Sequence, residues 1–170
     1  SITLPFVGAS ANETHNVKSL FGYVFGLPTH SGYNDNEKYV PTSLKTVVIT
    51  NATQIVPYSF FGCTSLTNVT IQGSVTTIET NAFRACTSLC SVTLPDTLQT
   101  IGETAFRDCA IKNMVIPNGV TSIGRAAFAY CRYLKEIHIS ETVETIGMDA
   151  FFECLQIDRV YITDLSAWCR

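Results

Sequence analysis

The sequence lacks the features that several large functional classes require. Only 15% of its 170 residues are charged, the net charge is −3 and no basic run occurs, so it offers no electrostatic surface for nucleic acid. No apolar stretch approaches the roughly 20 residues of a membrane span. Residues 1–5 have neither the basic start nor the apolar core of a signal peptide. With 46% hydrophobic residues, the chain is nevertheless expected to be folded rather than disordered.

Motifs for catalysis and for cofactor binding are missing as well. The only histidines are His15, His30 and His138, and none stands with a serine, a cysteine and an acid in a recognisable nucleophile motif. The sequence contains no P-loop, no dinucleotide fingerprint and no H-E-x-x-H zinc motif. We therefore predict that the protein is not an enzyme and that it has no catalytic residues, no cofactor and no metal site.

What the sequence does contain is one phrase of 22–23 residues, present five times. The copies span residues 44–64, 66–87, 89–110, 111–132 and 134–155, and a partial sixth opens at 157. Each has the form L-x-x-V-x-I, a turn, and then V-x-x-I-G-x-x-A-F-x-x-C. The phenylalanines of this motif are Phe60, Phe83, Phe106, Phe128 and Phe151. A fixed period of this size predicts a solenoid, in which each unit buries its apolar face only against its neighbours.

One coil illustrates the expected local structure. Leu66, Val69 and Ile71 alternate with polar residues, which is typical of a half-buried strand. After a turn, Val75 and Ile78 predict a second, shorter extended segment. The A-F-x-x-C stretch that follows is too short for a free-standing helix, so we expect one helical or 3₁₀ turn there. Its phenylalanine should fill the end of the coil.

Glycine follows the second isoleucine of the motif in three coils, at Gly102, Gly124 and Gly147, whereas Val56 and Glu79 stand there in the other two. A strict requirement for positive φ would exclude a valine. Glycine is therefore expected to be preferred at this corner but not obligatory.

Seven cysteines would suggest disulfides or metal in a short secreted chain, but five of them share one position in the repeat. These five are Cys63, Cys86, Cys109, Cys131 and Cys154. They should form a column of parallel side chains, which neither face each other as a disulfide requires nor converge on one point as zinc requires. We expect buried thiols that fill the core. Cys169 falls outside the column and is expected to be exposed.

These residues closely resemble the BspA-type leucine-rich repeats, a family of bacterial and protist surface proteins. The resemblance rests on I-P-x-x-V-x-x-I-G-x-x-A-F-x-x-C-x-x-L at residues 116–134 and on the matching positions of the other coils, and it covers residues 44–162. It implies a right-handed leucine-rich-repeat solenoid, mainly β with short helical or 3₁₀ turns. It also implies export to the cell surface and adhesive or host-interaction roles, and it carries over no catalytic residues.

We expect a single solenoid domain over residues 1–170, with irregular N-terminal coils and a loop in 1–43, regular repeats in 44–162 and the start of a truncated coil in 163–170. Leu4 and Ile49 are 45 residues apart, so two coils could fit between them, with a strand at residues 21–24. The stretch 27–41, rich in Gly, Pro, Asn and Asp, predicts an extended loop. That loop either carries binding or merely spans a degenerate coil.

Two outward positions of each long strand form the surface of the predicted sheet. In coil order they are Thr46 and Val48, Asn68 and Thr70, Ser91 and Thr93, Asn113 and Val115, Glu136 and His138, and Arg159 and Tyr161. The first four pairs are small and nearly neutral, while the last two bring together charge, an imidazole and a phenol. Aromatic and arginine residues are the usual anchors of interfaces. The predicted binding residues are Asn113, Glu136, His138, Arg159 and Tyr161, on one continuous sheet; the alternative is ordinary solvated side chains.

Two functional hypotheses follow from these features. The first is a non-enzymatic module of an extracellular or cell-surface adhesin that binds a host protein or glycan. The second is a structural spacer whose repeats project another domain from the cell surface. The chain begins like the end of a repeat strand, so we expect a piece of a longer protein whose signal peptide and anchor lie elsewhere. Open strand edges at both ends predict end-to-end self-association.

Overall fold

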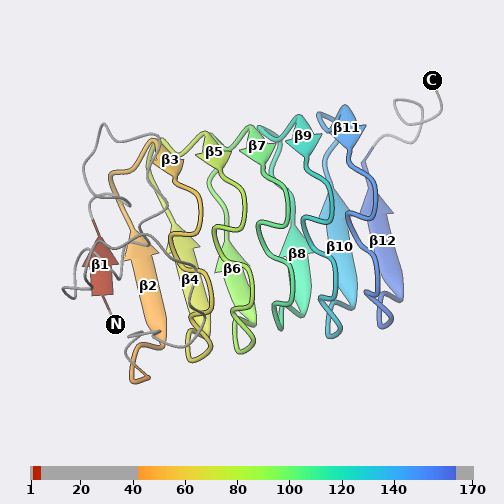
Figure 1. Ribbon diagram of the computed structural model, residues 1–170. Helices are drawn as coiled ribbons and strands as arrows, with labels where there is room; N and C mark the ends of the chain where they lie inside the picture. Colours follow the sequence, from red (N-terminus) through yellow and green to blue (C-terminus); the bar gives the residue numbers. More distant parts are fainter. Residues whose placement is uncertain (1, 5–41, 164–170) are drawn as a thin grey trace.

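The computed structural model describes residues 2–4 and 42–163, which form a row of stacked coils (Figure 1). Each coil has a long strand, a short strand and a stretch of turns. The long strands are β1 (Ile2–Leu4), β2 (Thr46–Ile49), β4 (Asn68–Ile71), β6 (Ser91–Thr93), β8 (Asn113–Val115), β10 (Glu136–Ile139) and β12 (Arg159–Ile162). The short strands are β3 (Gln54–Ile55), β5 (Thr77–Ile78), β7 (Thr100–Ile101), β9 (Ser122–Ile123) and β11 (Thr145–Ile146). The predicted β-solenoid is confirmed.

Neighbouring long strands are parallel and keep the register of the repeat. In β2 and β4, Val47 pairs with Val69 and Ile49 with Ile71, and all four side chains are at least 99% buried. The polar or small residues between them face outward, as the alternation with a period of two requires. The short strands β3, β5, β7, β9 and β11 form a second parallel sheet in sequence order.

The sheet of long strands is not continuous. It divides into a four-stranded sheet, β1-β2-β4-β6, and a three-stranded sheet, β8-β10-β12. The break follows the one short coil: Cys109 and Ile111 are two residues apart, whereas the matching Cys86 and Leu89 are three apart. Near the break, Lys112 N–H donates to the carbonyl of Cys90 at 3.4 Å. The prediction of one continuous sheet surface was therefore wrong between β6 and β8.

The A-F-x-x-C stretch is not helical, and the described residues contain no helix. Two residues with positive φ, four apart, recur in every coil. They are Tyr58, Asn81, Thr104, Ala126 and Asp149 at the first position, and Gly62, Ala85, Asp108, Tyr130 and Glu153 at the second. A helical or 3₁₀ turn requires negative φ throughout. The expectation of such a turn was wrong because left-handed residues convert the stretch into consecutive turns.

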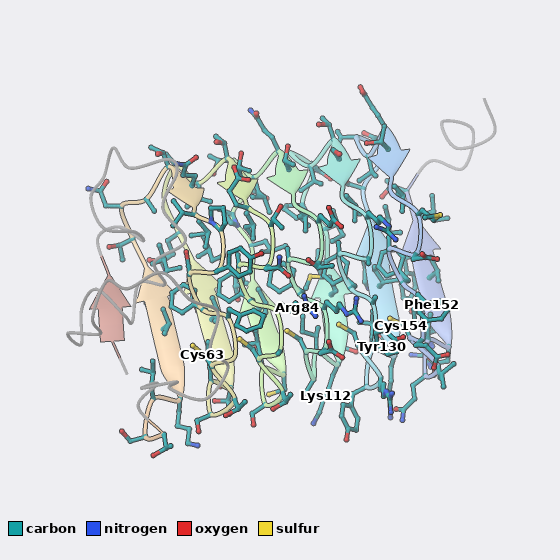
Figure 2. All side chains as sticks on the ribbon, in the orientation of Figure 1. Cys63, Arg84, Lys112, Tyr130, Phe152 and Cys154 are labelled. Carbon is teal, nitrogen blue, oxygen red and sulfur yellow. The ribbon has the colours of Figure 1, made fainter. Side chains whose placement is uncertain are left out.

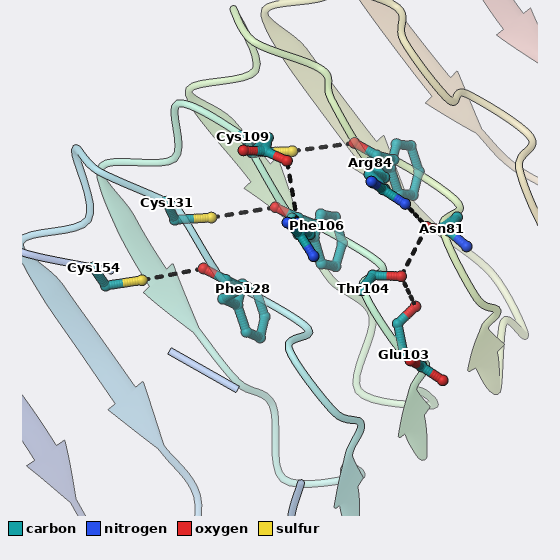
Figure 3. A network of polar contacts seen from close by, with 12 residues as sticks. Asn81, Arg84, Glu103, Thr104, Phe106, Cys109, Phe128, Cys131 and Cys154 are labelled. Atoms are coloured by element: carbon teal, nitrogen blue, oxygen red, sulfur yellow. Dashed lines mark hydrogen bonds and ion pairs between the residues drawn. The ribbon is translucent and has the colours of Figure 1, made fainter. Parts of the chain in front are cut away.

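The first of these turns has the geometry of a type II turn. In the second coil, Ala82 N–H donates to the carbonyl of Glu79 at 3.2 Å, and the residue before Ala82 is Asn81, with φ 58°. Type II turns need positive φ at this third position. Thr104 takes the same conformation with φ 53°. Its hydroxyl lies within hydrogen-bond distance of two acceptors, Asn81 Oδ1 at 2.8 Å and the carbonyl oxygen of Glu103 at 2.7 Å (Figure 3), and donates its one proton to either of them. Either bond helps to hold a β-branched residue in a region it rarely visits.

The turn stretches also bond to each other from coil to coil. Phe60 N–H donates to the carbonyl of Ala82 at 2.7 Å, and Phe83 N–H donates to Ala105 at 2.8 Å. The same bond continues from Phe106 to Ala127 and from Phe128 to Ala150. Two strand ladders and this ladder of turns thus hold neighbouring coils together on three sides, except between β6 and β8, where the ladder of long strands is interrupted.

The phenylalanines of the repeat form a stack that runs from coil to coil. Successive ring centroids from Phe60 to Phe151 lie 4.9, 5.2, 5.4 and 5.4 Å apart, with planes parallel within 8°. Rings in contact at these separations stabilise the folded state by more than the burial of their apolar area alone. The prediction that phenylalanine fills the end of each coil is confirmed.

Strand β1 is the direct neighbour of β2, with Leu4 paired to Ile49. No strand lies between them, so the prediction of an intervening strand at residues 21–24 was wrong. Residues 21–24 themselves lie outside the described residues. The loop 27–41 and the segment 164–170 lie outside the described residues, as do His15, His30 and Cys169.

The corner glycines are favoured by the close approach of the coils. Gly102, Gly124 and Gly147 do not have positive φ. A Cβ on Gly124, however, would lie 2.7 Å from the backbone of Gly102 and of Glu103 in the preceding coil. Since Glu79 occupies the same corner of the second coil, glycine is preferred without being obligatory, as expected.

Replacing Phe106 with alanine is predicted to lower the free energy of unfolding by roughly 3–5 kcal/mol, because it opens a cavity between the rings of Phe83 and Phe128. Urea-induced unfolding followed by circular dichroism measures the change. Phe152→Ala, which truncates a ring that is 49% exposed, is the matched control and should cost far less. Equal costs for the two variants would contradict the importance of the stack.

Gly124→Ala is predicted to lower the free energy of unfolding by about 1–3 kcal/mol, since the new Cβ forces two coils apart. Glu79→Ala is the matched variant at the same corner and should stay within about 0.5 kcal/mol of wild type. Thermal unfolding of both variants compares them directly. If Gly124→Ala left the free energy of unfolding unchanged, the coils would be able to move apart without a loss of stability, which contradicts the prediction.

Candidate functional site

All five residues predicted to bind a ligand lie on the three-stranded sheet. Asn113 pairs with Glu136 and Glu136 with Arg159, so these three side chains form one row across β8, β10 and β12. His138 pairs with Tyr161 in the second row. The structure therefore brings the predicted residues together on one face, separated from the outward residues of β2, β4 and β6 by the break in the sheet.

The two rows have different chemistry. In one, the guanidinium of Arg159 donates to the carboxylate of Glu136 in an exposed ion pair, and hydrogen bonding to Glu136 raises the pKa of Arg159 above its ordinary value. In the other, the rings of His138 and Tyr161 stack with centroids 4.1 Å apart and planes 14° apart. The face therefore combines a charged row with an aromatic row.

Val115 extends the aromatic row by one strand. It pairs with His138 and leaves 62% of its surface exposed, against 44% for Tyr161. Val115 is an outward position of the predicted sheet, but it is not among the predicted binding residues because it has neither charge nor a ring. Its high exposure is a property of the folded sheet that a single sequence position does not reveal.

The outward face of the first sheet differs in kind. Its described positions carry small or polar side chains: Thr46, Val48, Asn68, Thr70, Ser91 and Thr93. Among the described residues, all seven large hydrophobic side chains that are exposed lie between Val115 and Tyr161. The difference between the two halves of the solenoid is therefore one of apolar exposure as well as charge.

A second group of arginine and aromatic side chains lies on the turn stretches and was missed by the sequence analysis. The Arg107 guanidinium lies 5.0 Å from the centre of the Tyr130 ring, and Arg132 lies 5.8 Å from it. Tyr130 contacts Phe152 edge to face, with centroids 5.5 Å apart, and Figure 2 shows both on neighbouring turn stretches. In the sequence, this group could have been found from the two positions between the repeated phenylalanine and the repeated cysteine, because their residues vary from coil to coil.

The cysteine column is buried, as predicted, and four of its five thiols donate a hydrogen bond to a carbonyl of the preceding coil (Figure 3). The pairs are Cys86 Sγ to the carbonyl of Phe60 at 3.1 Å, Cys109 to Phe83 at 3.2 Å, Cys131 to Phe106 at 3.2 Å and Cys154 to Phe128 at 3.1 Å. The thiols thus add a hydrogen bond between coils to carbonyls of the turn stretch, and a carbonyl oxygen has two lone pairs to accept it; the Phe60 carbonyl, for example, also accepts the N–H of Cys63 at 3.1 Å. Burial raises the pKa of the Cys86 and Cys109 thiols.

All six cysteines within residues 42–163 are free thiols. In the described part of the chain, no group of three or more His, Cys, Asp or Glu side chains is arranged to hold a metal ion. Residues 2–4 and 42–163 also contain no helix with the length and apolarity that crossing a membrane requires.

The turn geometry and the column of phenylalanine and cysteine match a known type of repeat. A family model described as the BspA type leucine rich repeat region matches residues 53–167 with six copies. The chain belongs to the BspA-type leucine-rich repeat family. A comparison with curated proteins finds no significant match.

Solved structures with the same fold come from bacterial members of the leucine-rich repeat class. A leucine-rich repeat protein of T. pallidum is 30% identical with a TM-score of 0.68, over 72% of this chain and 60% of that one. A leucine-rich cell surface protein of Faecalibacterium prausnitzii is 29% identical with a TM-score of 0.71, over 76% of this chain and 35% of that one. The pneumococcal vaccine antigen PcpA, 19% identical with a TM-score of 0.62 over 69% of this chain and 30% of its own, shares the fold. This BspA-type repeat chain therefore spans less than two thirds of the length of each of these proteins.

The buried thiols predict that stability falls as the pH rises above about 8.5. There, thiols of the unfolded chain ionise, whereas those of Cys86 and Cys109 stay protonated in the folded state because their pKa is raised. The unfolded state then binds fewer protons, so the free energy of unfolding decreases with pH, by up to about 1.4 kcal/mol per pH unit for each thiol. Urea unfolding between pH 7.5 and 9.5 measures the slope.

Cys86→Ala should make that slope shallower, whatever its effect at pH 7.5. Val69→Ala, which truncates a buried side chain that does not titrate, is the control: it should lower stability at every pH and leave the slope unchanged. Identical slopes for wild type and Cys86→Ala would exclude the thiol as the cause.

Proposed function

We propose that this module is a non-enzymatic binding element of an extracellular or cell-surface protein, and that it contacts an extracellular or host protein through the face of β8, β10 and β12. The observation that carries the proposal is the pair of unlike rows on that face. Val115, His138 and Tyr161 form an exposed apolar and aromatic row, and the ion pair of Glu136 and Arg159 lies beside it.

This arrangement resembles the general anatomy of protein interfaces, in which apolar and aromatic anchors lie beside polar groups. The face spans several strands of a rigid solenoid, and such surfaces serve extended recognition in repeat proteins. Since the ring stack and the ion pair already exist in the free module, little side-chain entropy remains to be lost on binding. A glycan is the other ligand class that the sequence suggested for this protein.

The proposed location draws support from one relative and from the thiols. The Faecalibacterium prausnitzii structure, a leucine-rich cell surface protein, covers 76% of this chain. Free thiols are unusual in oxidising surroundings, but the five of the column are at least 91% buried and are therefore shielded from oxidants. An extracellular location is compatible with this chemistry.

The spacer hypothesis remains the alternative and is favoured by the first sheet, whose outward face is small and mostly polar. A spacer, however, has no need of an exposed aromatic row on one half of its length. End-to-end association also stays a prediction. Val160 pairs with Ile137 on the neighbouring strand; Ile137 is 2% exposed, whereas Val160 is 52% exposed and could pack against another copy of the chain. Sedimentation measurements at several concentrations address that association separately from ligand binding.

The double substitution Arg159→Ala with Tyr161→Ala is predicted to reduce binding at least tenfold, because it removes the charged and the aromatic anchor together. The probes are purified laminin, collagen and fibronectin, immobilised as a panel for biolayer interferometry with the whole chain. Binding of wild type to one of them is the starting point for the comparison.

The matched control is Asn68→Ala with Thr70→Ala, which changes the equivalent positions of β4 on the first sheet. It should bind as wild type does. Unchanged affinity of the Arg159 and Tyr161 variant, or an equal loss in both variants, would refute the proposed face. Absence of wild-type binding to every member of the panel would favour the spacer.

A further inference from the structure

The turn side of the solenoid contains a hollow of about 220 Å³ over the third to fifth coils, away from the sheet face. Ala126 and Ala129 line it, and both are more than 90% buried. The equivalent positions of the neighbouring coils carry larger side chains, Thr104 and Arg107 before them and Phe152 after them. The hollow therefore exists because the fourth coil has only the methyl side chains of Ala126 and Ala129 where the neighbouring coils have larger ones.

One wall of the hollow is aromatic. Tyr130 and Phe152 line it and contact each other edge to face at 5.5 Å. The Arg107 guanidinium, which also lines the hollow, lies 5.0 Å from the centre of the Tyr130 ring. This contact and an ion pair from Arg107 Nε to Asp108 at 3.3 Å restrain the arginine. A guanidinium has five donors, so its terminal NH₂ groups remain available to a ligand.

The rim carries donors and acceptors in balance. Arg125 and Glu103 line the hollow and lie 3.8 Å apart, and Asp149 contributes a second carboxylate. Guanidinium groups donate and carboxylates accept, so a ligand with several hydroxyl groups can bond to both. An anion would have to compete with these carboxylates. The balance therefore favours an uncharged, polyhydroxylated ligand.

We propose that this hollow is a binding site for a single neutral sugar ring, such as the terminal residue of a glycan. The C–H face of the ring would pack on Tyr130 and Phe152, and its hydroxyl groups would bond to Arg107, Arg125 and the carboxylates of the rim. The volume lies below the roughly 300–1,000 Å³ of pockets for drug-sized ligands, which limits the occupant to one ring. This site is independent of the protein-binding face proposed above.

Saturation-transfer difference NMR tests the proposal on the whole chain. The probes are the methyl glycosides of glucose, galactose, mannose and N-acetylglucosamine, with methyl glucuronide as the charged comparison. For a ligand of about 13 heavy atoms we expect a Kd on the order of 1 mM. At least one neutral glycoside should receive saturation at its ring protons. Saturation of none of them, or of the glucuronide alone, would overturn the proposal.

Ala129→Phe should abolish the signal, since it fills the hollow with a side chain that the repeat already carries at this position in Phe61 and Phe152. Arg84→Phe places the same ring at the same position of the second coil and is the matched control, with the wild-type signal expected. Undiminished binding by Ala129→Phe would refute the assignment of the site.

Tyr130→Ala provides a second variant should Ala129→Phe fail to fold. Ala85 has φ 60° at the equivalent position, so the backbone accepts alanine there. Its affinity for the same glycoside should fall at least fivefold, and an unchanged affinity would count against the proposal. The Arg159 and Tyr161 double variant should retain wild-type sugar binding, which separates this site from the sheet face.

Discussion

The structure depends on keeping neighbouring coils in register at a close and constant separation. Three ladders of backbone hydrogen bonds connect the coils, of which only the ladder of long strands is interrupted, between β6 and β8. The phenylalanine rings stack 4.9–5.4 Å apart between these ladders. The corners approach so closely that a Cβ on Gly124 would lie 2.7 Å from the preceding backbone. Left-handed Thr104 and Tyr130 are tolerated within this frame because bonds from both neighbouring coils fix their backbone. Strained residues persist where the surroundings determine them in this way.

A constant register also decides where recognition can arise. A side chain at one repeat position always has the same position of the next coil as its neighbour, so an outward substitution changes the surface without changing the core. On the sheet face, this places the ring of His138 on that of Tyr161 and the charge of Glu136 beside Arg159. On the turn face, the same rule turns two alanines of one coil into a hollow. Variation between coils thus builds sites on a scaffold that does not vary.

The repeat period was sufficient to predict the stacked coils, the inward columns, the phenylalanine stack and the buried thiols, since each follows from periodicity and apolar alternation. The helical turn was predicted wrongly because A-F-x-x-C is short and mostly apolar. Of the ten positive-φ residues of the turns, only Gly62, Asn81, Asp108 and Asp149 are of types that favour positive φ. The break between β6 and β8 follows from one missing residue before Ile111, whose effect on pairing depends on tertiary geometry. The pairing of β1 with β2 is equally a matter of topology, which residue spacing alone does not determine.

The candidate sites, too, could be predicted from the sequence only in part. The five predicted residues share one sheet because register is encoded in the repeat, but the contribution of Val115 depends on exposure in the folded state. The hollow on the turn side was not predicted because it arises from what Ala126 and Ala129 lack, and an alanine in a repeat normally signals tight packing. Since the core separates this hollow from the sheet face, changes at one do not touch side chains of the other. A single solenoid can therefore carry two recognition surfaces that vary independently while the columns between them stay the same.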